Sequence, residues 1–318
     1  MRVVLGPMEG VLDHLMRELL TDINDYDLCV TEFVRVIDRL LPEHVFHRIC
    51  PEIAHNSQTA NGTPVHIQLL GQRPEWMAEN AVRAAELGAK GIDLNFGCPA
   101  KLVNKSGGGA LLLKDPELIH QIVKTVREAV PSSIPVTAKI RLGWDDPNQC
   151  FEIVNAVENA KASGLTIHAR TKVGGYKADA IAWEYITKVK QTATIPLTAN
   201  GEVWNHQDAM DCLATTGCDS LMICRGALNT PNLGNVVKYQ HNALPWEDVV
   251  SLLIRYSNYE IKGDKGLYYP NRVKQWMNFL RKQYPQAADL FRVIRVHNKA
   301  APIVELLKQH HKQLKSAA

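Results

Sequence analysis

Residues 91–110 read GIDLNFGCPAKLVNKSGGGA, and this stretch joins two different patterns. An apolar run typical of a buried strand leads directly into a polar segment with a cysteine, a proline, two lysines and three consecutive glycines. A buried structural cysteine needs no such neighbours. The pattern therefore predicts a strand whose carboxyl end opens into a loop with a chemical task.

Short apolar runs of the same kind recur along the chain, and most are separated by segments with helical periodicity. Asp115 and Asn205 are suitable N-caps for two of these helices, and Gly88 can end a third. Alternating strands and helices predict parallel strands, and eight runs favour a (β/α)8 TIM barrel over an open sheet. The runs are residues 2–8, 27–33, 65–71, 91–97, 135–141, 165–170, 195–201 and 219–226.

The pattern changes after about residue 240, where residues 243–266, 272–284 and 287–314 are helical with no strand between them. We expect a barrel domain over residues 1–243 and a small helical domain over 244–318, with the boundary near Pro245. Residues 246–318 hold 13 Lys and Arg against 6 Asp and Glu, a net charge of +7 in a chain whose total is +3. This asymmetry predicts either a nucleic-acid partner or a solvated, lysine-rich helix face.

The composition argues against several other classes of protein. Seven cysteines, an odd number without a CxxC pair, do not suggest a disulfide scaffold or a zinc site, so we expect a cytoplasmic protein without a metal. The apolar run near the N-terminus is broken by Gly6 and Pro7, which argues against a signal peptide or membrane span. Nothing in the sequence suggests a subunit interface, and we expect a monomer.

Polar residues gather where the predicted strands end, which is where barrel enzymes place their chemistry. Each alone has a structural interpretation, but several polar groups buried together are costly unless a ligand compensates them. The loops after the last two strands also contain the glycines and the arginine that a phosphate group requires. The residues concerned are Gln68, Asn95, Cys98, Lys139, Arg141, His168, Arg170, Asn200, Gly201, Glu202, Arg225 and Gly226.

Eight motifs, in order over essentially the whole chain, resemble the tRNA-dihydrouridine synthases. They are PMEGVLD (7–13), TEFV (31–34), QLLG (68–71), DLNFGCPAKLVNKSGGGALLL (93–113), AKIRLGW (138–144), IHART (167–171), ANGE (199–202) and RGAL (225–228). Three segments are most similar to subfamily C, which modifies position 16. They are PMEGVLD (7–13), TEFVRV (31–36) and NRVKQW (271–276). The chain departs from the family pattern at Leu12, where threonine is usual, and at Cys224, where glycine is usual.

The resemblance implies an FMN-dependent reduction of a uracil ring in tRNA, with NADPH or NADH as the electron donor. Reduced FMN would deliver a hydride to C6, and Cys98 would protonate C5. A free thiol is mostly protonated near neutral pH and can act as this acid, although a lone cysteine is more often structural. The proline and glycines would form a loop that carries the thiol over the substrate and reshapes when tRNA arrives.

The same resemblance implies which residues contact the flavin. Asn95 and His168 face the uracil or the flavin ring, and we assign Asn95 to the substrate and His168 to the cofactor while leaving the alternative open. Without the resemblance, Lys139 has a rival interpretation as a Schiff-base lysine. The expected cofactor residues are Pro7, Met8, Glu9, Gln68, Lys139, His168, Asn200, Gly201, Glu202, Cys224 and Arg225.

For tRNA, the resemblance implies contacts by Arg35, Tyr176, Arg272, Lys274 and Arg295. The target base has to leave the tRNA fold to be reached. The aromatic residues of the basic tail, Trp276 and Phe279, either stack on RNA or belong to the core.

Three alternatives remain open. The substrate can be another uridine of the D-loop, or the chain can be a barrel that reduces a free pyrimidine, which leaves the basic tail unexplained. It can also be a catalytically idle RNA-binding protein, which leaves Cys98 and Lys139 without a purpose. Bound flavin and NADPH oxidation would exclude the idle protein, and dependence on folded tRNA would exclude the free-pyrimidine reductase.

Overall fold

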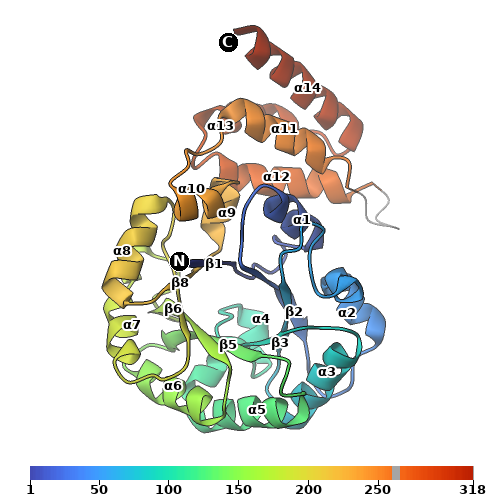
Figure 1. The fold of residues 1–318 in the computed structure, drawn as a ribbon. Helices are drawn as coiled ribbons and strands as arrows, with labels where there is room; N and C mark the ends of the chain where they lie inside the picture. The colour runs from blue at the N-terminus through green and yellow to red at the C-terminus, as the bar shows by residue number, and fades with distance from the viewer. Residues whose placement is uncertain (260–265, 318) are drawn as a thin grey trace.

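Eight parallel strands form a closed barrel in the computed structural model, which describes residues 1–259 and 266–317 (Figure 1). The strands follow one another around the barrel in sequence order, and β8 pairs with β1, so the predicted (β/α)8 architecture is confirmed. They are β1 Arg2–Leu5, β2 Leu28–Arg35, β3 Val65–Leu70, β4 Ile92–Asn95, β5 Val136–Gly143, β6 Gly164–Thr171, β7 Leu197–Asn200 and β8 Ser220–Ile223.

Helices surround the strands in the alternating order that the sequence predicts (Figure 1). Both expected N-caps are present, because the side chain of Asp115 accepts a hydrogen bond from Leu118 N and that of Asn205 from Asp208 N. The α-helices are α1 His14–Asp22, α2 Glu43–Ile49, α3 Pro74–Glu86, α4 Lys101–Lys105, α5 Pro116–Ala129, α6 Gln149–Asn159, α7 Trp183–Lys190, α8 His206–Thr216, α9 Arg225–Asn229 and α10 Leu233–Tyr239. The 3-10 helices are η1 Pro51–His55, η2 Gly109–Lys114 and η3 Ala178–Ala180.

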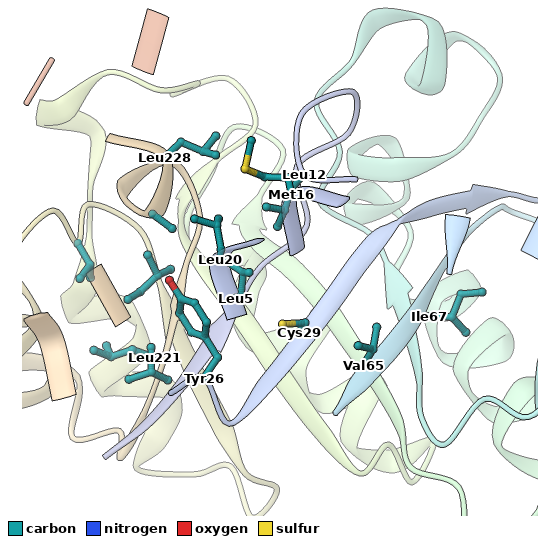
Figure 2. Close-up of a cluster of buried hydrophobic side chains, with 14 of the residues drawn as sticks. Leu5, Leu12, Met16, Leu20, Tyr26, Cys29, Val65, Ile67, Leu221 and Leu228 are labelled. Atoms are coloured by element: carbon teal, nitrogen blue, oxygen red, sulfur yellow. The ribbon is translucent and has the colours of Figure 1, made fainter. Parts of the chain in front are cut away.

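The main hydrophobic core lies between the strands and the helices. Figure 2 shows part of it, where Leu5 and Cys29 from the strands lie near Met16 and Leu20 of α1. These four side chains are at most 2% exposed. Because successive residues of a strand point to opposite faces, the residues between the outward apolar ones point into the barrel.

The inward-facing residues of several strands are polar. In β5, Val136, Ala138 and Ile140 are core residues, whereas Thr137, Lys139 and Arg141 alternate with them. The same alternation in β6 directs Thr166, His168 and Arg170 inward. A strict period of two in short strands therefore produces an apolar outer layer and a polar interior.

Four helices follow the barrel and pack together at one side of it (Figure 1): α11 Trp246–Tyr256, α12 Tyr268–Leu280, α13 Pro285–Ile294 and α14 Ala300–Ala317. Pro245 immediately precedes α11, and residues 260–265 of the first predicted helical stretch lie outside the described residues. Trp276 is 1% exposed, and its Nε1 donates to Leu228 O of α9 at 3.1 Å, so α12 is packed on the barrel. The division at residues 243 and 244 stays a prediction.

Within residues 1–259 and 266–317, no helix combines the length and the apolar character needed to cross a membrane.

Candidate active site

A cavity of about 480 Å³ lies at the carboxyl ends of the strands. Most of the residues that the sequence predicts for the site line this one cavity, although they come from distant parts of the chain. The predicted residues that line it are Pro7, Met8, Glu9, Gln68, Asn95, Cys98, Lys139, His168, Tyr176, Asn200, Gly201, Glu202, Cys224 and Arg225.

A chain of hydrogen bonds orients the loop that carries Cys98. The buried carboxylate of Asp93 accepts from Gln68 Nε2 at 2.7 Å, and Gln68 Oε1 accepts from Asn95 Nδ2 at 2.7 Å. Asn95 Oδ1 in turn accepts from the backbone N–H groups of Gly97 and Cys98, both at 3.0 Å. Because a carboxylate only accepts, Asp93 determines which way both amide side chains point.

The other side of Cys98 is held by the segment that follows it. Cys98 O accepts from Asn104 Nδ2 at 3.0 Å and from Ala110 N at 2.9 Å. Gly109 has φ +63°, and a Cβ there would lie 2.7 Å from Cys98 O. The glycine run therefore allows the backbone to fold tightly against the cysteine. The predicted reshaping of this loop on tRNA arrival stays a prediction.

The thiol of Cys98 is partly buried at the cavity wall. Burial raises its pKa above the usual value, and the nearby Glu9 adds to the rise. The group is therefore a neutral thiol at neutral pH, with a proton to donate into the cavity.

Lys139 places an amino group in the wall of the cavity. Its Nζ donates to Asn200 Oδ1 at 3.0 Å, and Asn200 Nδ2 donates to Met222 O at 2.8 Å, which fixes the amide at both ends. Burial lowers the pKa of Lys139. Only one of its N–H groups has an acceptor among the described residues, so the amino group can also donate to a carbonyl or anionic group of a ligand.

His168 is buried next to several cations. Burial, followed by the charges of Arg141 and Lys139, lowers its pKa well below the usual value. The imidazole is therefore neutral at physiological pH and can hydrogen-bond a ligand without adding charge. A Cβ at Gly201 would lie 3.1 Å from the His168 ring, so glycine permits this close approach.

The loops after β7 and β8 form a charged cluster. Glu202 Oε1 lies 3.0 Å from Arg225 Nη2 and 2.8 Å from Nη2 of the fully buried Arg170. Arg170 Nε and Nη1 have no hydrogen-bond partner among the described residues. The Arg225 guanidinium also lies 4.7 Å from the Tyr176 ring centre. Two arginines against one carboxylate leave this corner positive and suited to an anion.

The cavity is also lined by residues to which the sequence analysis gave no contact with cofactor or uracil, among them Arg141, Trp204, Phe33 and Phe279. Arg141 was visible as a polar strand residue, and its guanidinium lies 5.1 Å from the Tyr176 ring centre. Phe279 belongs to α12 and had two interpretations, core or RNA contact; it lines the cavity, whereas Trp276 is a core residue. Helical periodicity cannot separate these two aromatics, because they lie on adjoining parts of one face.

The remaining predicted residues lie outside the cavity. Arg35 donates to Ser106 Oγ at 2.6 Å, near the Cys98 loop, and Arg272 Nε lies 3.2 Å from Asp13 Oδ2. Lys274 Nζ donates to Asn298 Oδ1 at 2.9 Å, and Arg295 is exposed at the end of α13. In the described parts of the chain, no cluster of His, Cys, Asp or Glu side chains is arranged to hold a metal ion.

Comparison with known families gives one match that covers nearly the whole chain. The family described as dihydrouridine synthase (Dus) matches residues 4–315. Three similar relatives are each named tRNA-dihydrouridine(16) synthase. The protein of Vibrio parahaemolyticus is 68% identical, with 99% of this chain and 98% of the relative covered. The protein of Salmonella typhimurium is 58% identical, with 97% of this chain and 99% of the relative covered. The protein of Escherichia coli K12 is 57% identical, with 97% of this chain and 98% of the relative covered.

Solved structures share the architecture at low sequence identity. Morphinone reductase has a TM-score of 0.54 and 12% identity, covering 77% of this chain and 87% of that chain. A variant of NCR from Zymomonas mobilis has a TM-score of 0.53 and 13% identity, covering 76% and 88%. At such identities the likeness concerns the barrel fold alone.

Proposed function

Because the chain belongs to the dihydrouridine synthase family, we propose that it reduces the C5=C6 bond of a uridine in tRNA, at position 16 of the D-loop, with FMN as cofactor and NADPH or NADH as electron donor. One observation supports this chemistry most directly. A neutral thiol, Cys98, and the amino group of Lys139 face the same cavity of about 480 Å³. The names of relatives at 57–68% identity support tRNA and position 16.

The cavity suits a flavin that carries a phosphate. Within the described residues Lys139 has N–H groups left without an acceptor, beside the neutral His168, and the loops after β7 and β8 supply Arg225 together with Gly201 and Gly226. We assign Pro7, Met8, Glu9, Gln68, Lys139 and His168 to the ring, and Asn200, Gly201, Glu202, Cys224 and Arg225 to the ribityl chain and phosphate. When bound, FMN would supply the hydride for C6 of the uracil.

The protein's own residues would provide the proton and the orientation. Cys98 holds a proton at Sγ and donates it to C5 of the substrate, and the raised pKa keeps that proton in place until the ring is reduced. Asn95 fixes the Cys98 backbone with its oxygen, and its Nδ2 is held by Gln68. We assign Asn95 to the substrate side of the cavity.

We propose that the tRNA docks on the basic helical region, residues 244–318, and on the cavity rim. Arg35, Tyr176, Arg272, Lys274 and Arg295 are the proposed contacts, and Tyr176 is 53% exposed at the cavity. The enzyme would then act as a monomer in the cytoplasm, on tRNA whose target base has left the fold.

The decisive experiment maps dihydrouridine by mass spectrometry in tRNA from cells without this gene, complemented with variants. We expect loss at position 16, restored by the unmodified protein and by Cys150→Ala, a buried cysteine of α6 outside the cavity. Cys98→Ala should fail to restore it, because removal of a general acid typically costs about 10²–10⁴ in rate.

Two results would contradict the proposal. An unchanged pattern in the deletion strain, where no other synthase covers the site, would remove tRNA as the substrate. Equal restoration by Cys98→Ala and Cys150→Ala would remove the thiol as the acid. Reduction of free uridine in preference to folded tRNA would favour a free-pyrimidine reductase.

A further inference from the structure

The turn that follows β1 is held from two opposite sides. Pro7, Met8 and Glu9 line the cavity, and Gly10 comes directly after them. Gly10 N donates to Glu32 Oε1 of β2, and Gly10 O accepts from Gln275 Nε2 of α12 at 2.8 Å. The peptide beside the cavity is thus anchored to the barrel on one side and to the helical region on the other.

The turn has few hydrogen bonds of its own. Val11 N and Leu12 N both donate to Met8 O, at 3.1 and 2.9 Å. Gly10 has φ +72° and is exposed, and a Cβ there would meet nothing within 4 Å, so the space beside its Cα is open. Leu12 is buried in the core and Met8 and Val11 pack against it, so the exposed Gly10 peptide is the part of the turn that depends on the groups binding it.

Gln275 uses both ends of its side chain at this point. While Nε2 donates to Gly10 O, Oε1 accepts from Arg272 Nη1 at 2.9 Å, and Arg272 Nη1 also donates to Gly10 O. Arg272 is itself anchored, because its Nε lies 3.2 Å from Asp13 Oδ2. The three side chains form one network between α12 and the start of α1.

Helix α12 is rigidly placed relative to the rest of the site. Trp276 binds Leu228 O of α9, the helix that begins at Arg225, and Phe279 lines the cavity itself. The helix therefore contacts the segments after β1 and after β8, at the two ends of the barrel sequence.

We propose that Gln275 is a positioning residue: by holding Gly10 O it sets the Pro7–Glu9 wall against the cofactor. The helical region would then complete the active site in addition to docking tRNA. This inference rests on the proposed function, since it takes the cavity ligand to be FMN.

The test compares Gln275→Leu with Gln283→Leu, an exposed glutamine that lies three residues after α12 and outside the cavity. Dissociation of FMN from the full-length holoenzyme is followed by flavin fluorescence. We expect Gln275→Leu to weaken FMN binding about three- to tenfold, the equivalent of one lost hydrogen bond. The kcat on tRNA should fall while KM for tRNA stays unchanged, and Gln283→Leu should match the unmodified protein in both.

The outcomes separate the two proposals. Equal FMN dissociation and kcat for both variants would overturn the role of Gln275. Failure of the unmodified protein to hold FMN would overturn the proposed function instead. If Gln275→Leu does not fold, Gln275→Met removes the same donor with a flexible side chain, and the same comparison applies.

Discussion

One histidine that points into the barrel makes the stability of the protein depend on pH. His66 of β3 fills the space that Gly91 leaves open, because a Cβ at Gly91 would lie 2.1 Å from its ring. Part of the residue is exposed, but Nδ1 is buried without a hydrogen-bond partner in the described chain. Burial, with a contribution from Arg2, lowers the pKa of His66 to about 4.

This histidine should make the protein less stable in acid. The folded state favours the neutral imidazole, whereas the unfolded chain binds a proton near pH 6.5. The contribution is fully present above that pH and is lost as the pH falls from 6.5 towards 4. We expect a loss of about 2 kcal/mol from His66 between pH 7.5 and 5.0, measured by urea unfolding.

The control for this loss is a histidine on the surface. His66→Gln should unfold with a smaller dependence on pH than the unmodified protein, whereas His44→Gln, at an exposed site on α2, should keep the full dependence. Equal pH dependence in His66→Gln and the unmodified protein would contradict the assignment.

At the scale of elements, the loop between β4 and α5 fixes the backbone of Cys98. Asn95 binds the backbone before Cys98, and Asn104 binds the carbonyl after it. Gly109 makes room for that carbonyl. The glycines that the sequence suggests for mobility therefore have a second use, which is close packing against Cys98.

An alanine at Gly109 should impair catalysis more than stability. A positive φ costs any residue with a Cβ about 1–2 kcal/mol, and here the Cβ would also press on Cys98 O. We expect Gly109→Ala to lower kcat at least about tenfold by displacing the thiol from the reacting ring. Thermal unfolding and tRNA reduction assays would measure the two effects.

Gly62→Ala is the control variant for Gly109→Ala. Gly62 has φ +89°, but its Cβ would meet nothing within 4 Å, so it bears the same kind of backbone strain without touching Cys98. It should lose similar stability and keep its kcat. A similar kcat in both variants would show that the Cys98 loop tolerates the added methyl group.

At the scale of the whole molecule, charge is divided between the two parts of the chain. The last 73 residues, 246–318, carry a net charge of +7, whereas the net charge of the whole chain is +3. The barrel part is therefore slightly acidic. Exposed cations such as Arg295 of this part are available to phosphates, whereas Arg2 lies at the opposite, amino-terminal end of β1. Long-range attraction between these cations and the phosphates of a nucleic acid is screened by salt.

Binding of tRNA should therefore weaken steeply as salt rises. We expect Arg295→Gln to reduce the slope of log K against log salt by about 1, because one phosphate contact is lost. Arg2→Gln, at the far end of the barrel, should leave the slope unchanged. Filter binding over a range of salt concentrations would measure both slopes. Equal slopes for the two variants would exclude Arg295 from the interface.

Much of the site was predictable because its signals are local. A period of two identifies Lys139 of β5 and His168 of β6 as inward-facing, and Cys98 follows the end of β4; in a closed barrel such residues meet in one place. Asp93 was not assigned a role, and Phe279 was left between an RNA contact and the core. Asp93 acts through Gln68 and Asn95, and Phe279 shares its helix with the core residue Trp276, so their roles depend on partners from other elements.

The order of the strands, the barrel and the place of Cys98 in the loop after β4 follow from short-range patterns, because strand and helix periods repeat over a few residues and family motifs are contiguous. Contacts between distant residues follow only from three-dimensional packing. Gln275 and Gly10 are 265 positions apart, and no local pattern relates them. Their hydrogen bond exists because α12 packs against α9 and returns the end of the chain to the beginning of the barrel.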